Sequence, residues 1–174
     1  MPKIIENIRE KLLEEAKRQV REDGYSSMTI RSVASACGVG TGTVYNYFPS
    51  KDMLIASFMM DDWILCVETI SKEMEQADNV KDALYCMYKE LLKYKERYKL
   101  LFNDENAEMG NNDSLMKRHN LLRGHLAEPV KAWTQNQNRV DATFLAEFVA
   151  ENMLLYAVAE KDFELVASVL LQLF

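Results

Sequence analysis

Apolar residues recur every three to four positions along nearly all of this 174-residue chain, which is the spacing of one face of an α-helix. No stretch shows the sustained alternation of apolar and polar residues that indicates a β-strand. The chain also holds only three prolines and six glycines, so few positions interrupt a helix. These features predict an all-α fold.

The composition excludes two other classes of chain. Hydrophobic residues make up 48% and charged residues 28%, a balance typical of globular proteins and unlike that of disordered ones. No apolar run approaches the roughly 20 residues needed to cross a bilayer. The first residues mix Lys, Arg and Glu, which is unlike a signal peptide. We therefore expect a cytoplasmic protein with no membrane partner.

The net charge of −6 at first argues against nucleic acid, because neutralising phosphates requires Lys and Arg. The charge is unevenly distributed, however. Residues 1–52 hold eight Lys and Arg against seven Asp and Glu, so the remaining 122 residues carry −7. Such an asymmetry is expected if only one end of the chain meets DNA.

The N-terminal segment predicts a helix of about 20 residues that ends at Gly24. Its apolar residues stand at every fourth position: Ile4, Ile8, Leu12, Ala16 and Val20. The next segment, Ile30 to Phe48, has the requirements of a helix-turn-helix: a small residue where the helices cross, a glycine in the turn and apolar residues inside both helices. These are Ala34, Gly38 and the set Val33, Cys37, Val39 and Val44. Any helical hairpin with a glycine turn could give this pattern alone.

The segment after the turn is more specific. The residues from Gly38 to Leu54, GVGTGTVYNYFPSKDML, resemble the signature of the TetR (tetracycline repressor) family, and Gly24-Tyr25 and Thr29-Ile30 also fit it. The resemblance covers about residues 8–58. It implies about nine helices: an N-terminal three-helix DNA-binding domain over residues 1–49 and a helical effector-binding and dimerisation domain over residues 50–174. It also implies a homodimeric repressor that releases a pseudo-palindromic operator when a small molecule binds.

The chemistry of the motif agrees with DNA binding. Thr41, Thr43 and Asn46 are the candidate base readers, because their side chains donate and accept hydrogen bonds and Asn suits adenine. Gly40 and Gly42 let the helix start approach the duplex closely. Thr29, Tyr47 and Lys51 are expected to position the protein on phosphates. Arg31 and Tyr45 are further candidates for DNA contact. Tyr45 can equally be a packing residue, and Lys51 a solvated charge.

Two positions depart from the family pattern. Ser32 stands three residues after Thr29, where the family often has an acid, which predicts a weakened capping box. Gly40 replaces the usual serine and removes one hydroxyl contact to phosphate, leaving only the backbone amide.

The C-terminal part is rich in aromatic residues and methionine, a composition suited to adaptable apolar binding. Aromatic residues and methionines at helical spacing are equally typical of an ordinary helical core. We expect the effector to be an apolar or amphipathic molecule, with these candidate contacts: Trp63, Tyr85, Tyr88, Tyr98, Phe102 and Trp133. His119 and His125 are six residues apart and have no Cys or His at helical spacing, so no metal site is expected.

The last two predicted helices carry more apolar surface than one face needs, which a four-helix interface between two subunits would bury, as in the family. The expected interface residues are Phe144, Phe148, Asn152, Tyr156, Val166, Leu170 and Phe174.

Two rival functions remain. An enzyme is disfavoured, since no paired carboxylates, activated nucleophile, metal-ligand cluster or phosphate-binding glycine loop stands out and no cofactor is expected. The other rival is a helical dimeric interaction protein, or an activator with no small-molecule switch. A test of DNA binding would separate the helical interaction protein from a regulator.

Overall fold

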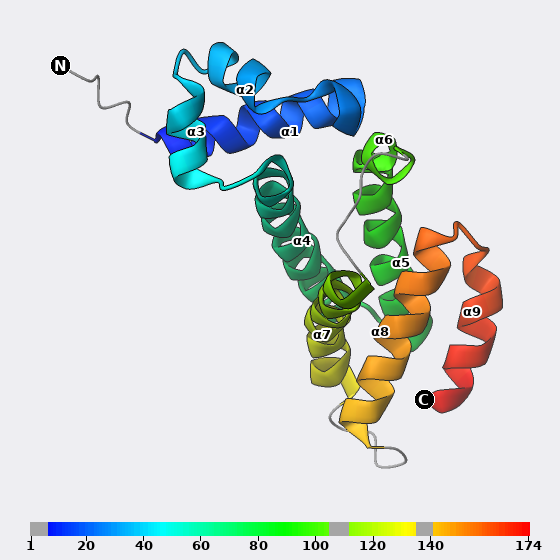
Figure 1. Ribbon diagram of the computed structural model, residues 1–174. Helices are drawn as coiled ribbons and strands as arrows, with labels where there is room; N and C mark the ends of the chain where they lie inside the picture. Colours follow the sequence, from blue (N-terminus) through cyan, green and yellow to red (C-terminus); the bar gives the residue numbers. More distant parts are fainter. Residues whose placement is uncertain (1–6, 105–111, 135–140) are drawn as a thin grey trace. The chain divides into compact units, whose positions relative to one another are not determined.

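The computed structural model describes residues 7–104, 112–134 and 141–174. These residues form nine α-helices and one short 3₁₀ helix and contain no strand (Figure 1). The predicted all-α fold of about nine helices is therefore confirmed. The helices are α1 (Ile8–Ser27), α2 (Ile30–Ala36), α3 (Thr41–Tyr47), α4 (Lys51–Glu75), α5 (Val80–Arg97), α6 (Lys99–Phe102), α7 (Asn112–Thr134), α8 (Ala142–Val158), α9 (Phe163–Leu170) and η1 (Leu171–Leu173).

Contacts divide the chain into two compact units. Unit 1 comprises Met1–Asp61 and Arg97–Met109, and unit 2 comprises Asp62–Glu96 and Gly110–Phe174. The first turns of α4 and the short helix α6 thus belong with the helix-turn-helix. The functional division expected between residues 49 and 50 stays a prediction.

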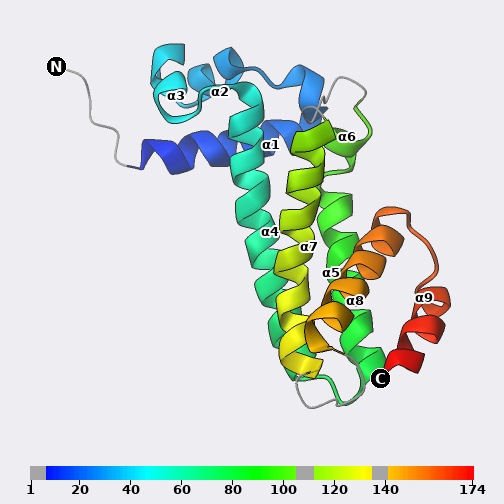
Figure 2. The same ribbon diagram turned by 60° about the horizontal axis from the view of Figure 1, so that its bottom comes forward.

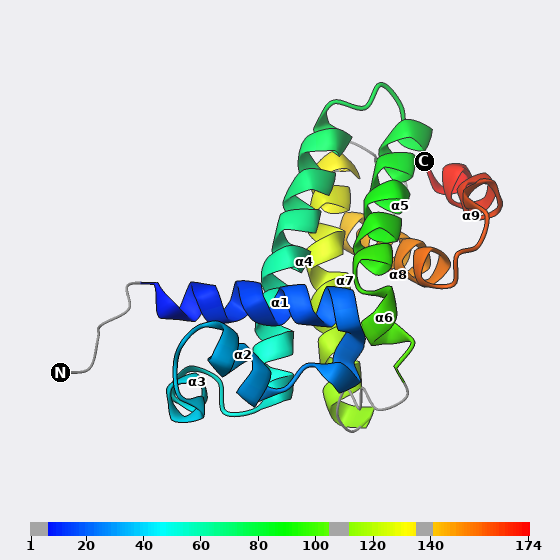
Figure 3. The same cartoon turned by 90° about the horizontal axis from the view of Figure 1, so that it is seen from above.

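In unit 1, α1 packs against α2 and α6, and α2 packs against α3 (Figure 3). Leu12, Ala16 and Val20 are buried, as their four-residue spacing predicts. Ile4, the first residue of that series, lies outside the described residues. The aromatic rings of Phe58 and Tyr98 stack in the same interior, with 6.1 Å between their centres.

Gly24 interrupts α1 where the sequence predicts an end. Its φ of +82° lies in the left-handed region, which a residue with a Cβ rarely adopts, and the chain bends there before one further turn. After this bend the backbone N–H and the hydroxyl of Ser26 both donate to the carboxylate of Asp104, at 2.9 and 3.0 Å. The carboxylate of Asp104, which lies just beyond α6, therefore fixes the end of α1.

Unit 2 is built around α7, which packs on α8, while α8 packs in turn on α9 (Figure 2). Carboxylates cap the last two helices, because Asp141 accepts from the N–H of Phe144 and Asp162 from that of Glu164. The helix α7 continues through Pro129 to Thr134. The largest wholly buried side chains of this unit are Trp63, Ile70, Met74, Leu84, Met87 and Leu126. None of the helices in the described ranges combines the length and apolar character needed to cross a bilayer.

Candidate nucleic-acid interface

The helix-turn-helix is held by its backbone and by one reciprocal cap. Gly38 has a φ of +68° in the turn, and the N–H of Val39 donates to the carbonyl of Ala34 at 2.9 Å, which closes the end of α2. Val33 and Val44 are fully buried, so α2 and α3 are fixed against the interior of unit 1. The turn thereby sets the direction of α3.

The capping box at the start of α2 corrects the expectation drawn from Ser32. The N–H of Ser32 donates to Oγ1 of Thr29, and the N–H of Thr29 donates to Oγ of Ser32, both at 3.0 Å. The Ser32 hydroxyl also donates to Oε1 of Gln19 at 2.6 Å. The short serine side chain therefore completes the cap that the family's acid would supply, and ties it to α1.

The start of α3 has no such cap. Its N-cap residue, Gly40, offers no side-chain hydrogen bond. The first-turn amides of a helix have no partner within the helix itself. As the sequence indicates, Gly40 has no hydroxyl to offer at the start of α3. The group that remains there for a phosphate is the backbone amide.

The ten predicted DNA-contact residues all belong to unit 1. Thr43 and Lys51 are half-buried, and the other eight are exposed: Thr29, Arg31, Gly40, Thr41, Gly42, Tyr45, Asn46 and Tyr47. Tyr45 and Tyr47 keep 53% and 45% of their surface exposed, which favours contact over packing for Tyr45. Five of the ten line one shallow hollow, together with Met28 and Ile30: Thr29, Arg31, Thr41, Tyr45 and Lys51.

Lys51 has internal partners that the sequence does not reveal. Its Nζ donates to the carbonyl oxygen of Tyr25 at 2.6 Å and lies 3.8 Å from the centre of the Tyr25 ring. The Tyr25 hydroxyl in turn donates to Oδ1 of Asp52 at 2.8 Å. Burial lowers the pKa of Lys51, while the carboxylates of Asp52 and Asp104 act in the opposite direction. The ammonium group thus links the end of α1 to the start of α4 at the rim of the hollow.

The six predicted effector contacts are divided between the two units. Tyr98 and Phe102 belong to unit 1, where Tyr98 is buried and Phe102 is exposed. The other four lie in unit 2, where their rings make contacts at three different aromatic residues. Trp63 meets Tyr94, Tyr85 and Tyr88 both meet Phe163, and Trp133 meets Phe174.

The predicted subunit interface is only partly exposed in one chain. Phe144 and Phe148 are exposed, and their rings stack with centres 6.2 Å apart. Asn152, Tyr156 and Phe174 are half-buried.

On α9 the expectation needs correcting, because Val166 and Leu170 are buried inside the unit at 3% and 1% exposure. The apolar residues that α9 exposes are Leu165 and Val169, each one position earlier in the sequence.

Sequence reasoning also missed Arg123 and the His119 contact. His119 Nε2 lies 2.8 and 3.0 Å from the two carboxylate oxygens of Glu151, across the contact between α7 and α8. Arg123 stands one turn further along α7, and its Nε is buried without a hydrogen-bond partner. A lone arginine four residues after a histidine, among leucines, was the available signal.

This helix-turn-helix matches a known family. Residues 12–58 match the model of bacterial regulatory proteins of the tetR family. The transcriptional repressor AcnR of Corynebacterium efficiens is 32% identical over 66 residues, which are 38% of this chain and 35% of AcnR. The match to this curated relative therefore spans about a third of the relative's length.

Solved structures match over nearly the whole chain, and they show the fold alone because identities are low. A TetR-family transcriptional regulator from Streptomyces coelicolor has a TM-score of 0.67 at 17% identity, covering 95% of this chain and 99% of that one. The regulator FadR from Bacillus subtilis, solved in complex with stearoyl-CoA, has a TM-score of 0.59 at 14% identity, covering 94% and 96%.

Proposed function

The chain belongs to the TetR family of bacterial regulatory proteins, and from that premise we propose that it is a transcriptional regulator that binds duplex DNA through α2 and α3. One observation carries the proposal. The residues that sequence reasoning assigned to DNA contact lie on the same unit, eight of the ten are exposed, and five of them line one hollow shared by α2, α3 and the start of α4. In this arrangement Thr41, Thr43 and Asn46 read base edges in the major groove, while Thr29, Arg31, Tyr47 and Lys51 position the protein on phosphates.

The protein acts as a homodimer in this proposal. The support is the exposed apolar surface of α8 and α9, where Phe144, Leu155, Leu165 and Val169 each keep more than half of their surface exposed. Apolar surface of this kind marks an interaction site, and two copies packed through these helices would cover it. A two-fold dimer reads a pseudo-palindromic site whose half-sites lie about one helical turn apart, or a multiple of it.

The regulator is a repressor that a small molecule releases from its operator in the bacterial cytoplasm. The support is the share of the chain outside the helix-turn-helix and its likeness in fold to FadR, which was solved with stearoyl-CoA. An effector that releases DNA must bind the DNA-free protein more tightly, and DNA must weaken effector binding by the same factor.

Selection from random duplexes tests the central proposal. The full chain is incubated with random-sequence DNA, bound duplexes are recovered through several rounds, and the enriched sequence is tested by gel shift and light scattering. We expect one pseudo-palindrome to be enriched and one dimer to bind it. A chain that enriches no sequence is instead the rival helical interaction protein. Transcription from a promoter that carries the selected site then separates repressor from activator.

A further inference from the structure

Two buried hydrogen-bond donors of unit 2 have no acceptor among the described residues. The indole Nε1 of Trp63 on α4 is buried, and the side chain is only 1% exposed. The Nε of Arg123 on α7 is also buried and unpartnered. Buried donors without acceptors are rare in folded proteins, and each one calls for an acceptor beyond the described residues.

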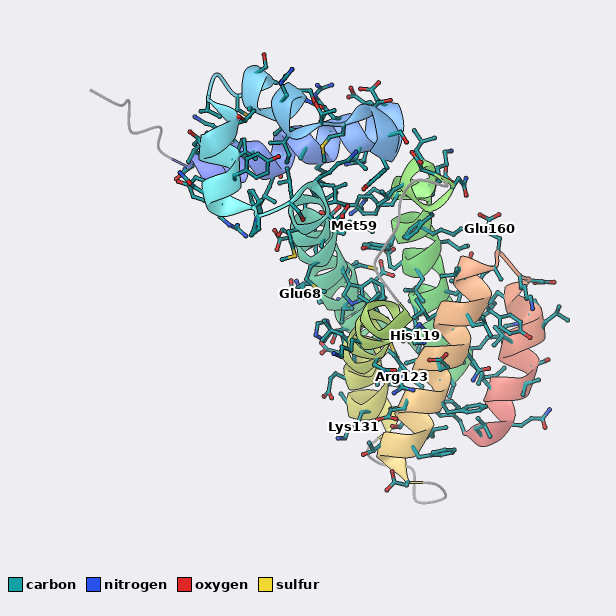
Figure 4. All side chains as sticks on the ribbon, in the orientation of Figure 1. Met59, Glu68, His119, Arg123, Lys131 and Glu160 are labelled. Carbon is teal, nitrogen blue, oxygen red and sulfur yellow. The ribbon has the colours of Figure 1, made fainter. Side chains whose placement is uncertain are left out.

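The charge of Arg123 is also unpaired in the part of the chain that the structure describes. No ion pair within residues 7–104, 112–134 and 141–174 includes it. On α8, both carboxylate oxygens of Glu151 already face His119, which stands one turn before Arg123 on the same face of α7. Figure 4 shows His119 and Arg123 on the side of α7 that faces α8. A guanidinium stays charged at any physiological pH, so this half-buried cation favours an anion beside it.

Trp63 comes from a neighbouring helix of the same unit. The part of α4 that begins at Asp62 lies beside α7 in both Figure 2 and Figure 3. The indole ring meets the Tyr94 ring edge-on, with the centres 5.2 Å apart. An aromatic wall beside a hydrogen-bond donor suits a ligand that has an apolar body and a polar end.

We propose that unit 2 binds an anionic amphiphile whose oxygen atoms accept hydrogen bonds from Nε of Arg123 and Nε1 of Trp63. The inference rests on the proposed function and gives the effector a chemical class. Nε and one terminal nitrogen of a guanidinium form a fork that fits two oxygens of a carboxylate or a phosphate. The effector is therefore a carboxylate or a phosphate ester with an apolar chain or ring, and not the wholly apolar molecule that the aromatic composition alone allows.

The test uses three amphiphiles with the same chain, decanoate, decyl phosphate and decanol, titrated calorimetrically into the full-length protein without DNA. At least one of the anions should bind about tenfold or more tightly than decanol. The tighter anion then tells whether the site prefers a carboxylate or a phosphate. Because DNA is absent, the result does not depend on operator binding, which is measured separately by gel shift.

Variants assign the selectivity to the two donors. Arg123→Gln should lower the affinity for the anion about tenfold or more and leave that for decanol unchanged. Lys131→Gln, which removes one positive charge from the same helix, is the matched control and should change neither affinity. Trp63→Phe should also weaken anion binding. The fold loss of anion affinity in the double variant should be smaller than the product of the fold losses in the two single variants, because both donors hold one ligand. A thermal melt of each variant verifies that it is folded.

Three results overturn the proposal: anions that bind no more tightly than decanol, no binding by any of the three, or Arg123→Gln that keeps the wild-type selectivity. In those cases water accompanies Arg123 and the Tyr94 ring meets the indole N–H. If Trp63→Phe does not fold, Arg123→Gln and its control decide alone. Loss of operator binding in the gel shift, with anion selectivity intact, would instead overturn the proposed function.

Discussion

The ammonium nitrogen of Lys51 lies 2.6 Å from the carbonyl oxygen of Tyr25 and 3.8 Å from the centre of its ring. Tyr25 follows the bend in α1, and Lys51 is the first residue of α4. The contact therefore joins the end of α1 to the start of α4 within unit 1. Because Lys51 also lines the hollow with Arg31 and Thr41, one side chain serves both the fold and the candidate interface.

Replacing Lys51 should for that reason have two effects. Lys51→Met should lower the free energy of unfolding by about 1–2 kcal/mol, since it loses a charged hydrogen bond and a cation–π contact. It should also reduce the slope of log operator affinity against log salt concentration by about one, which is the effect of losing one phosphate contact. Denaturant melts and binding at several salt concentrations measure the two effects. Lys72→Met, at the other end of α4, is the control, and an unchanged melt for Lys51→Met would refute the structural role.

Ser32→Ala tests the capping box. The alanine removes the acceptor for the N–H of Thr29 and the donor to Gln19, so we expect a loss of about 1 kcal/mol in unfolding free energy. Urea unfolding monitored by circular dichroism is the measurement. Ser35→Ala, exposed on the same helix, should be nearly neutral. Equal losses for the two variants would mean that the cap contributes nothing specific.

Asn46 is expected to read a base. Asn46→Ala should reduce discrimination at one operator position by about 1–3 kcal/mol while binding to mismatched sites changes little. The measurement compares the selected site with its single-base variants at fixed salt. If the alanine weakens matched and mismatched sites equally, Asn46 contacts the backbone of the DNA.

The exposed apolar face of α9 should hold the dimer together. Leu165→Glu combined with Val169→Glu places two charges at positions that are 61% and 59% exposed in one chain, so the fold is retained while the interface is lost. Light scattering should then show a monomer, and operator affinity should fall because a single helix-turn-helix buries too little surface. Ile64→Glu, an exposed apolar position on α4, is the control and should remain dimeric.

The ion pair between Glu73 and Lys89 should give unit 2 an acid-dependent stability. The ammonium group of Lys89, whose Nζ lies 2.9 Å from Oε2 of Glu73, lowers the pKa of Glu73 below its ordinary value of 4.5. A lowered carboxyl pKa means that the stabilisation is present above pH 4.5 and is lost as the pH falls through the lowered value. The pair is about one-third exposed, so the effect is at most about 1 kcal/mol.

Urea midpoints between about pH 7 and about pH 3 measure this loss. Glu73→Gln should fall less steeply than the wild type over the acidic part of the range. Glu68→Gln, exposed on the same helix and labelled in Figure 4, should follow the wild type. Parallel curves for all three proteins would exclude the Glu73 pair as the cause.

Local signals made most of the fold predictable. The four-residue spacing of Leu12, Ala16 and Val20 and the glycine in the turn at residue 38 act within one or two helices, where sequence distance and spatial distance agree. The contact of Lys51 with Tyr25 was not predictable, because the two residues are 26 positions apart and meet only after α1, α2 and α3 have packed.

The error on α9 has a different cause. Both neighbouring stripes of that helix are apolar, Leu165 with Val169 and Val166 with Leu170, so periodicity alone cannot tell which one is buried and which one is exposed. The role of Ser32 was underestimated because its second partner, Gln19, lies on another helix.

The carboxylate of Asp104 that holds Ser26 has a practical consequence for recombining such proteins. Asp104, which follows α5 and α6 in the sequence, belongs to the same unit as the helix-turn-helix and holds the end of α1. The segment that ends at residue 49 therefore lacks one of the residues that complete its own unit. A hybrid regulator that joins residues 1–49 to a foreign effector domain would leave the amide and the hydroxyl of Ser26 without their acceptor. An exchange of DNA specificity between relatives is better made by transplanting the side chains of α3 than by exchanging whole domains.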